Sequence, residues 1–264
     1  MTIQLAKKIN AKIICADSRI IYKNFDIVSA KPTVEERENI VHYLIDIIEP
    51  YQEFSAGDFV KLAKEIINNI DENIIISGGT WFYIKSLLDN KALIECPKNQ
   101  KLRDELNLLD NNILWEKLNS LDSKRASLIH PNNKDKIIRS IEMCLYLNQP
   151  VSEMKREDNF NYEAKWFMPE MERDELYQRI NQRVDLMINQ GLFEEWEKNN
   201  KLYPNNEIMK NTIGYSEFFE YEYKEAIEKI KQHTRNFAKR QLTYFKSAKH
   251  IIKINSLNDI LNEI

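Results

Sequence analysis

Residues 73–88, NIIISGGTWFYIKSLL, decide the fold class. The stretch NIIIS, residues 73–77, is a short and mainly apolar run that ends at the glycine pair Gly78 and Gly79. Thr80 then opens a segment with helical periodicity. A short apolar run closed by glycines is typical of a buried parallel strand, and a helix that follows directly completes a strand–turn–helix unit. The stretch therefore predicts an α/β fold.

The segments upstream repeat this alternation of strand and helix. KIIC (residues 12–15) and VHYLIDII (41–48) are short apolar runs that predict strands. SAGDFVKLAKEIINNI (55–70) predicts a helix, because Ser55 can cap its first turn and Asp58 stands three residues later. Strands that alternate with helices favour a parallel sheet, so we expect an α/β core.

The pattern changes from about Pro97. Helical periodicity with short polar breaks continues to about Phe160 and predicts a helical insertion. Beyond it, the sequence predicts a strand that returns to the sheet at 164–171, long helical stretches at 173–199 and 225–246, and a final strand at 250–254. We therefore expect an α/β core made of residues 1–95 and 161–264, with a helical insertion domain at 96–160.

Composition excludes several classes of protein. The net charge is −3, 43% of the residues are hydrophobic, and no apolar run approaches the roughly 20 residues that span a bilayer. The N-terminus has no signal-peptide pattern. The 3 cysteines form no C-x-x-C pair and the 4 histidines are scattered, which argues against a disulfide framework or a metal cluster. We expect a cytoplasmic protein that is not bound to a membrane.

Charge is unevenly distributed near the C-terminus. Residues 229–253 contain Lys and Arg but no acid, whereas residues 216–228 are rich in glutamate. Five of the basic residues recur at close to helical spacing: Lys231, Arg235, Lys239, Lys246 and Lys249. This basic stripe predicts contacts with a phosphate backbone. The alternative is a solvated helix face.

Polar and glycine residues follow two of the predicted strands. Gly78 and Gly79 would let backbone come close to a ligand, with the N–H groups of the next helix pointing at it. Asp17 follows the strand at 12–15 and would lie at the same edge of the sheet, where open α/β sheets bind their ligands. Two other interpretations remain open: the glycines could form a tight turn that binds nothing, and Asp17 could cap the following segment.

Several segments, in this order along the chain, carry a resemblance to a known family. They are ADSRIIYKNFDIVSAKP (16–32), VHYLIDIIEPYQEFSAGDF (41–59), ISGGTWFYIKSLL (76–88), RDELYQRINQRVDLMINQGLFEE (173–195), TIGYSEF (212–218) and RNFAKRQLTYFK (235–246). Together they closely resemble the bacterial tRNA dimethylallyltransferases, and the match covers essentially the whole chain. No single segment is decisive, but the ordered set is specific.

The resemblance implies a fold and a reaction. The fold would be a P-loop NTPase-like, nucleotide-binding type of parallel sheet. The enzyme would move a dimethylallyl group from dimethylallyl diphosphate to the N6 amine of the adenosine next to the anticodon, with Mg²⁺ as cofactor. Asp17 matches the family's base for the amine, Thr80 its site threonine, and Arg183 its diphosphate-contacting arginine. Gly78 and Gly79 would also bind the diphosphate. Without the resemblance, Arg183 would be read as a surface i,i+4 partner on a helix.

The resemblance also implies a tRNA surface. The partner would be the anticodon stem-loop of tRNA, bound by a monomer, and the target base would have to leave its stack to reach the site. The matching positions are Asp17, Ser18, Arg19, Ile20, Asp135, Lys136, Arg139, Asn211, Gly214, Tyr215, Lys239, Arg240, Gln241 and Lys246. No protein side chain is expected to form a metal site.

The sequence departs from the family at its beginning. The family opens with a strand and a phosphate-binding P-loop, G-x-x-x-x-G-K-S/T, whereas the first glycine here is Gly57. We expect that strand and loop immediately upstream of Met1, and we expect these 264 residues alone to be impaired in catalysis. Smaller departures lie at Asn24, Val28-Ser29 and Lys246. The alternatives are a non-catalytic tRNA-binding relative and, third, a P-loop-type kinase of a small metabolite.

Overall fold

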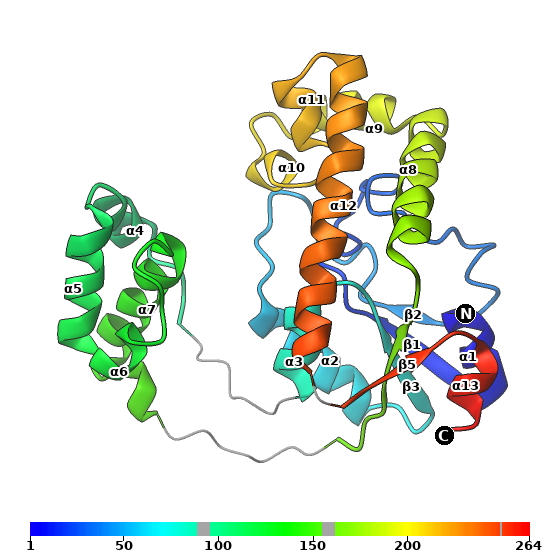
Figure 1. Ribbon diagram of the computed structural model, residues 1–264, viewed down its shortest axis with the longest axis horizontal. Helices are drawn as coiled ribbons and strands as arrows, with labels where there is room; N and C mark the ends of the chain where they lie inside the picture. The colour runs from blue at the N-terminus through cyan, green and yellow to red at the C-terminus, as the bar shows by residue number, and fades with distance from the viewer. Residues whose placement is uncertain (89–95, 155–161, 249) are drawn as a thin grey trace. The chain divides into compact units, whose positions relative to one another are not determined.

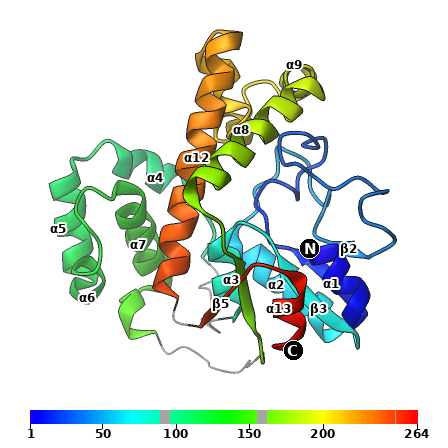
Figure 2. The same ribbon diagram turned by 45° about the vertical axis from the view of Figure 1, so that its right-hand side comes forward.

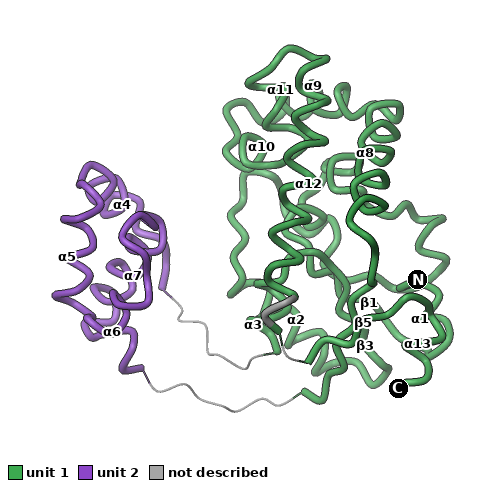
Figure 3. Tube along the Cα trace, in the orientation of Figure 1, with its two compact units in different colours: residues 1–89, 162–264 green, residues 90–161 purple. Residues whose placement is uncertain are grey.

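The computed structural model describes residues 1–88, 96–154, 162–248 and 250–264 (Figure 1). The chain divides into two compact units, which are described separately below (Figure 3). Unit 1 comprises Met1–Asp89 and Tyr162–Ile264, and unit 2 comprises Asn90–Asn161. Within the described ranges, no helix has the length and apolar character needed to cross a membrane.

A parallel sheet forms the centre of unit 1. Its strands are β1 (Ala11–Cys15), β2 (His42–Tyr43) and β3 (Asn73–Ser77), in the order β2-β1-β3. Ile13 of β1 pairs with Ile75 of β3 on one side and with His42 of β2 on the other. The prediction of an α/β fold with a parallel sheet is therefore confirmed.

The strand predicted at 41–48 is much shorter than expected. Only His42 and Tyr43 are extended in the sheet, because Leu44 and Asp46 adopt the left-handed conformation, with φ of 63° and 55°. The buried ammonium of Lys31 forms an ion pair with the Asp46 carboxylate. A long-range ion pair thus fixes a backbone conformation that the apolar pattern does not indicate.

The last strands form a separate parallel pair. β4 (Trp166–Pro169) pairs with β5 (Ile251–Ile254) and, among the described residues, with no strand of the β2-β1-β3 sheet. The expectation that β4 returns to that sheet is corrected accordingly. The β4-β5 pair contacts the rest of unit 1 through side chains, because Ile254 packs in a cluster with Leu5 and Ile75.

Helices surround these strands in unit 1. They are α1 (Thr2–Ile9), α2 (Ala56–Asn68), α3 (Trp81–Leu88), α8 (Arg173–Asn189), α9 (Leu192–Leu202), α10 (Glu207–Lys210), α11 (Ser216–Glu220), α12 (Tyr223–Ser247) and α13 (Leu257–Leu261). Figure 2 shows α8 running beside the long α12. Ser55 caps α2 as predicted, accepting a 3.2 Å hydrogen bond from the Asp58 N–H. The stretch predicted as one helix at 173–199 breaks at Gly191, where φ is +96°.

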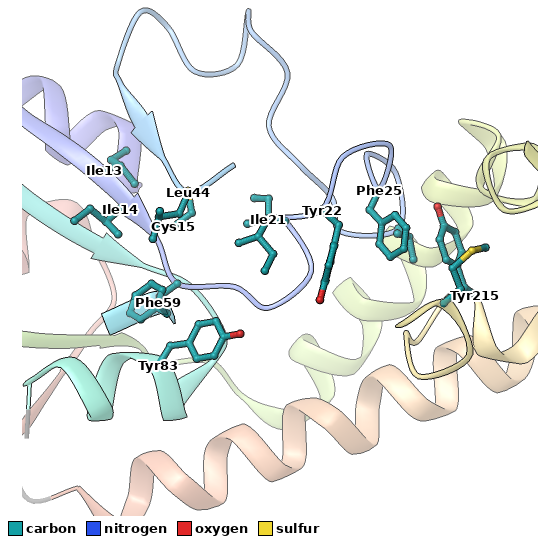
Figure 4. Close-up of a cluster of buried hydrophobic side chains, with 14 of the residues drawn as sticks. Ile13, Ile14, Cys15, Ile21, Tyr22, Phe25, Leu44, Phe59, Tyr83 and Tyr215 are labelled. Atoms are coloured by element: carbon teal, nitrogen blue, oxygen red, sulfur yellow. The ribbon is translucent and has the colours of Figure 1, made fainter. Parts of the chain in front are cut away.

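The core of unit 1 extends from Ile13 and Ile14 of the sheet to Tyr215 (Figure 4). It also includes Leu192 of α9 and Phe218 of α11. Phe59 stacks on Tyr83 with 4.8 Å between ring centroids, and Phe25 meets Tyr215 edge-to-face at 5.1 Å. Phe25, Phe59 and Tyr215 are fully buried. Phe25 therefore ties the segment after β1 to Tyr215 by aromatic packing, downstream of Asp17 in the same segment.

Unit 2 is helical. Its elements are α4 (Gln100–Asn107), α5 (Asn111–Leu121), α6 (Ser123–Ala126), α7 (Lys134–Leu147) and the 3₁₀ turn η1 (Val151–Glu153). Leu114 and Leu118 of α5 pack against Ile137 and Ile141 of α7, and all four side chains are fully buried. The i, i+4 spacing of both pairs gives each helix one apolar face.

A buried carboxylate ties α4 to α7. Glu142 accepts hydrogen bonds from both sides of the Arg103 guanidinium, at 2.9 and 2.7 Å, and from the Asn99 N–H at 2.6 Å. Arg139 forms a further ion pair with it. Burial by itself raises the pKa of Glu142, but these hydrogen bonds outweigh burial and hold the pKa at about 2.

We predict that unit 2 loses stability in acid through Glu142. A carboxyl group whose pKa is depressed by folding stabilises above its unfolded pKa, so the stabilisation is lost as pH falls from the ordinary glutamate pKa of 4.5 toward about 2. The expected loss in unfolding free energy is roughly 2–3 kcal/mol. Urea unfolding measures it, followed by the fluorescence of Trp115 in a chain whose other tryptophans, Trp81, Trp166 and Trp196, are replaced by Phe. Glu142→Gln should remove this pH dependence, and an unchanged acid transition in that variant would contradict the assignment.

Candidate active site

The loops after β1 and β3 are joined by hydrogen bonds. The Ala16 N–H donates to the Ser77 carbonyl at 2.8 Å, and the Thr80 N–H donates back to the Ala16 carbonyl at 3.0 Å. The Thr80 hydroxyl oxygen accepts from the Ser18 N–H at 3.0 Å. Adjacent parallel strands thus bring Thr80 beside the loop that carries Asp17, as their position at the sheet edge implies.

Each glycine of the pair meets a different neighbour. A Cβ atom at Gly78 would overlap the backbone carbonyl of Ala16, so only glycine allows the two loops to approach this closely. A Cβ atom at Gly79 would lie 2.5 Å from Nε2 of Gln241. That amide nitrogen donates a 2.7 Å hydrogen bond to the Gly79 carbonyl. The turn therefore contacts α12, far away in the sequence.

The two oxygens of the Asp17 carboxylate have different surroundings: Oδ1 is hydrogen-bonded to the backbone and Oδ2 is open. Its Oδ1 accepts the backbone N–H groups of Arg19 at 2.8 Å and Ile20 at 3.4 Å, so Asp17 does cap the turn that follows it. Oδ2 lies 3.9 Å from the position of a Cβ atom at Gly79. Among the described residues, no donor reaches Oδ2, which leaves this oxygen available to a ligand.

Arg19 links the Asp17 loop to α10. Its guanidinium donates to the Ser18 carbonyl and to the Asn211 carbonyl, both at 3.0 Å. The structure thus brings together predicted site residues from four parts of the sequence: Asp17, Ser18, Arg19, Gly78, Gly79, Thr80, Asn211 and Gln241. The Arg19 side chain is used in holding this arrangement.

Other predicted tRNA-contacting positions are buried. The Tyr215 hydroxyl donates to Glu195 at 2.7 Å, its side chain is fully enclosed, and burial raises its pKa. Gly214 has a φ of +99°, and its N–H donates to Glu217 at 2.8 Å. The Ile20 side chain is also buried. Packing and turn geometry account for these positions, so a contact with RNA there would come from the backbone.

The basic stripe on α12 is only partly open. Lys231 forms ion pairs with Asp185 at 2.8 Å and Glu228 at 3.1 Å, and Arg235 donates to Asn181 at 2.6 Å. These two side chains contact α8, so part of their hydrogen-bonding capacity is used inside the protein. Lys239 and Arg240 are exposed. The side chain of Lys246, and Lys249, lie outside the described residues.

Arg183 lies apart from the Asp17 loop. It is exposed on α8 and forms no hydrogen bond or ion pair with any residue that the structure describes, so no surface partner is found for it. The contacts from Asn181 to Arg235 and from Asp185 to Lys231 show that α8 and α12 pack antiparallel. Arg183 is therefore level with residue 233, about 12 Å along the axis of α12 from Gln241.

The remaining predicted tRNA contacts belong to unit 2. Asp135 and Lys136 are exposed in the first turn of α7, and Arg139 is paired with Glu142. Arg139 also donates to the Cys96 carbonyl at 2.8 Å, so its guanidinium is used inside unit 2.

The residues around Asp17 could bind a metal ion only together with a phosphate-bearing substrate. Over the described parts of the chain, no three His, Cys, Asp or Glu side chains gather as a metal site. Asp17 is the one carboxylate in the cluster defined above. Mg²⁺ is typically held by one or two carboxylates together with substrate phosphates and water, and the single Asp17 carboxylate fits that arrangement.

Sequence reasoning missed Glu195, which anchors the loop after β1. Its Oε2 accepts hydrogen bonds from the backbone N–H groups of Asp26 and Ile27, at 3.0 and 2.7 Å. Its Oε1 accepts the Val28 N–H at 3.0 Å and the Tyr215 hydroxyl. Glu195 is one of two adjacent glutamates on α9, and no local pattern distinguishes it from the exposed Glu194. Only the folded chain reveals the contact.

Comparison with known proteins identifies close relatives. The IPP transferase family model matches residues 20–248. A tRNA dimethylallyltransferase of Clostridioides difficile is 38% identical over 285 residues, which cover 100% of this chain and 91% of that protein. One of Alkaliphilus oremlandii is 40% identical over 272 residues, covering 97% and 87%.

Solved structures show the same similarity. The crystal structure of a tRNA delta(2)-isopentenylpyrophosphate transferase from Staphylococcus epidermidis superimposes with a TM-score of 0.68 at 38% identity, covering 99% of this chain and 91% of that chain. A eukaryotic dimethylallyltransferase acting on tRNA shares the fold, with a TM-score of 0.83 at 24% identity, covering 97% and 71%.

Proposed function

This chain belongs to the IPP transferase family, and on that basis we propose that it is a tRNA dimethylallyltransferase. It acts on the N6 amine of the adenosine next to the anticodon, uses dimethylallyl diphosphate, and yields N6-isopentenyladenosine. The observation that carries the proposal is the open Oδ2 of Asp17, beside the glycine turn and the Gln241 amide.

Asp17 serves as the proton acceptor. An exocyclic amine is a weak nucleophile because its lone pair is shared with the ring, so it needs a base within hydrogen-bond reach. The N6–C1 bond forms while the C1–O bond of dimethylallyl diphosphate breaks, and diphosphate leaves with that electron pair. The N6 proton passes to Asp17 Oδ2. Oδ1 stays bonded to the Arg19 and Ile20 N–H groups, which hold the carboxylate in place.

The diphosphate requires positive charge and N–H donors as it departs. Gly78, Gly79 and Thr80 supply the turn after β3, and Arg183 is a guanidinium without a partner among the described residues. Mg²⁺ would supply positive charge to the diphosphate, and Asp17 is the one carboxylate of the site that could help to hold it.

The tRNA is bound through its anticodon stem-loop. The exposed Lys239 and Arg240 of α12 contact the phosphate backbone, and Asp17, Asn211 and Gln241 surround the base that leaves its stack. Asp135 and Lys136 provide a further contact from unit 2. The enzyme works as a monomer in the cytoplasm, where its tRNA substrate is found.

Full activity also requires a phosphate-binding loop that these 264 residues do not contain. Thr2 at the start of α1 lies 3.3 Å from Ser77 at the end of β3, oxygen to oxygen. A loop that leads into α1 would therefore reach the Asp17 edge of the sheet.

The function is tested by mass spectrometry of tRNA nucleosides after incubation with dimethylallyl diphosphate and Mg²⁺. We compare the 264-residue chain with the same chain preceded by a strand and a G-x-x-x-x-G-K-S/T loop. The extended chain should form N6-isopentenyladenosine and the shorter chain little or none. Full activity of the shorter chain would contradict the need for the loop. Binding of tRNA without any transfer by the extended chain would instead support the non-catalytic alternative.

We predict that Lys239 and Arg240 determine the salt dependence of tRNA binding. Each phosphate contact contributes about 0.7–0.9 to the slope of log K against log salt concentration. The Lys239→Ala, Arg240→Ala double variant should therefore flatten the slope by roughly 1.4–1.8. Lys61→Ala, Lys201→Ala is the matched control, because it removes the same charge from exposed positions of α2 and α9. If the double variant and the original chain are both folded and show the same salt slope, the basic stripe is a solvated helix face that does not contact phosphates.

A further inference from the structure

A buried carboxylate joins α11 to α12. Glu217 of α11 is 1% exposed, and its Oε1 lies 2.7 Å from Nδ1 of His233 on α12. A carboxylate can only accept hydrogen bonds, so the imidazole must carry a proton on Nδ1. A carboxylate removed from water is costly unless donors surround it. Among the donors that the described residues supply to Glu217, only the His233 imidazole can also carry positive charge.

The other oxygen of Glu217 holds a turn made of residues 211–217, which we call the 211–217 turn. Its Oε2 accepts the Gly214 N–H at 2.8 Å and the Ser216 hydroxyl at 3.0 Å. Gly214 has a φ of +99°, and a Cβ atom there would lie 2.8 Å from Cγ2 of Val28. Glu217 therefore fixes a backbone conformation that glycine adopts most readily, at a point where the turn packs against the segment after β1.

The 211–217 turn also contacts the loop that carries Asp17. It begins at Asn211, whose carbonyl accepts a 3.0 Å hydrogen bond from the Arg19 guanidinium. The turn is compact, because the Thr212 carbonyl accepts two of its backbone N–H groups, at 2.9 and 2.8 Å. The backbone N–H of Arg19 in turn donates to Oδ1 of Asp17 at 2.8 Å. Contacts therefore run without a break from α12, through the turn, to the Asp17 carboxylate.

We propose that His233 is a positioning residue for prenyl transfer, which acts by holding Glu217 and through it the 211–217 turn. The inference rests on the proposed function and adds to it a residue that acts through other residues and not on the substrate. A loosened turn would withdraw the acceptor of the Arg19 guanidinium and let the Asp17 carboxylate change its orientation. The N6 amine would then meet its base in a poorer geometry, and a displacement of about 1 Å can lower a rate about 100-fold.

The test compares two substitutions of the same residue. His233→Leu removes the donor to Glu217, whereas His233→Asn keeps an N–H donor close to the position of Nδ1. Leucine is the better helix former of the two, so a defect of His233→Leu that asparagine corrects cannot come from helix propensity. Gln232→Leu is the matched control, because Gln232 is exposed on the same helix. Arg19→Met removes the guanidinium that bonds to the 211–217 turn.

The first measurement needs no catalysis. Amide hydrogen exchange of the 264-residue chain, followed by mass spectrometry, reports local opening of each segment. His233→Leu should speed exchange in the peptides that contain residues 17–20 and 211–217 by about 10- to 100-fold, as expected for losing a hydrogen bond to a charged group. His233→Asn and Gln232→Leu should behave like the original chain. Exchange in unit 2 should stay the same in every variant.

The second measurement is the single-turnover rate of prenyl transfer by the loop-extended enzyme, with saturating tRNA and dimethylallyl diphosphate. His233→Leu should lower this rate about 10- to 100-fold, and His233→Asn should restore most of it. The dissociation constant for tRNA should change less than the rate. In an Arg19→Met chain, His233→Leu should add little further loss, because both residues belong to one series of contacts.

Three results would overturn the role of His233 and leave the proposed function standing. One is an unchanged single-turnover rate in a folded His233→Leu variant, which would make the contact with Glu217 purely structural. Another is an equal loss with leucine and asparagine, because the donor would then not matter. The third is a fully additive loss with Arg19→Met, which would exclude a route through the turn. If the loop-extended original chain transfers no prenyl group, the proposed function fails, and unchanged exchange at 17–20 in His233→Leu would separately refute the link to Asp17.

Discussion

Asp17→Asn is expected to lower the rate of prenyl transfer by about two to four orders of magnitude, the range for removing a positioned base. The amide oxygen of asparagine can still accept the Arg19 and Ile20 N–H groups, so the turn should survive. The amide nitrogen in place of Oδ2 cannot take the N6 proton. Single-turnover rates with the loop-extended enzyme and saturating tRNA measure the chemical step.

The controls for this prediction separate chemistry from structure. Asp17→Ala removes both oxygens and should therefore also loosen the turn, which would lower tRNA affinity as well as the rate. Asp71→Asn, at an exposed loop position, should change neither. If Asp17→Asn leaves the single-turnover rate unchanged, Asp17 is only a cap for its turn and the proposed mechanism loses its base.

The sequence predicts the fold well where its signal is local. The apolar runs before Asp17 and Gly78 correspond to β1 and β3, and the Ser55 capping box begins α2 where expected. Where a long-range contact decides the backbone, the prediction fails. The segment around Leu44 and Asp46 has an apolar pattern, yet its left-handed residues and the Lys31 ion pair end the strand after Tyr43.

The candidate site is predictable only in part. A position at the end of a parallel strand is enough to expect Asp17 near Gly78, and the joined loops after β1 and β3 agree with this. The roles of Lys231 and Arg235 could not be read from α12 alone, because Asp185 and Asn181, which hold them, come from α8. A periodic stripe shows which residues share a face but does not show whether that face is occupied.

Substitutions in the glycine pair are the second case in which we expect a large effect, and Gly78 and Gly79 should differ in how much stability they cost. Gly78→Ala should lower the unfolding free energy by about 3 kcal/mol or more, because the new Cβ overlaps the Ala16 backbone and neither strand can move without breaking the sheet. Gly79→Ala should cost less than about 1 kcal/mol, because the group it meets is the flexible Gln241 side chain. Urea unfolding followed by circular dichroism measures both.

Gly79→Ala should nevertheless impair function, because it displaces the Gln241 amide from the Gly79 carbonyl and so separates α12 from the Asp17 loop. Gln241→Ala breaks the same hydrogen bond from the other side. Residues that share one contact give non-additive effects, so the double variant should transfer the prenyl group hardly more slowly than the worse single variant. Fully additive losses would mean that Gly79 and Gln241 act independently. Equal unfolding free energies for Gly78→Ala and Gly79→Ala would show that the Ala16 carbonyl can move aside, and the close approach of the two loops would then not explain the glycine at position 78.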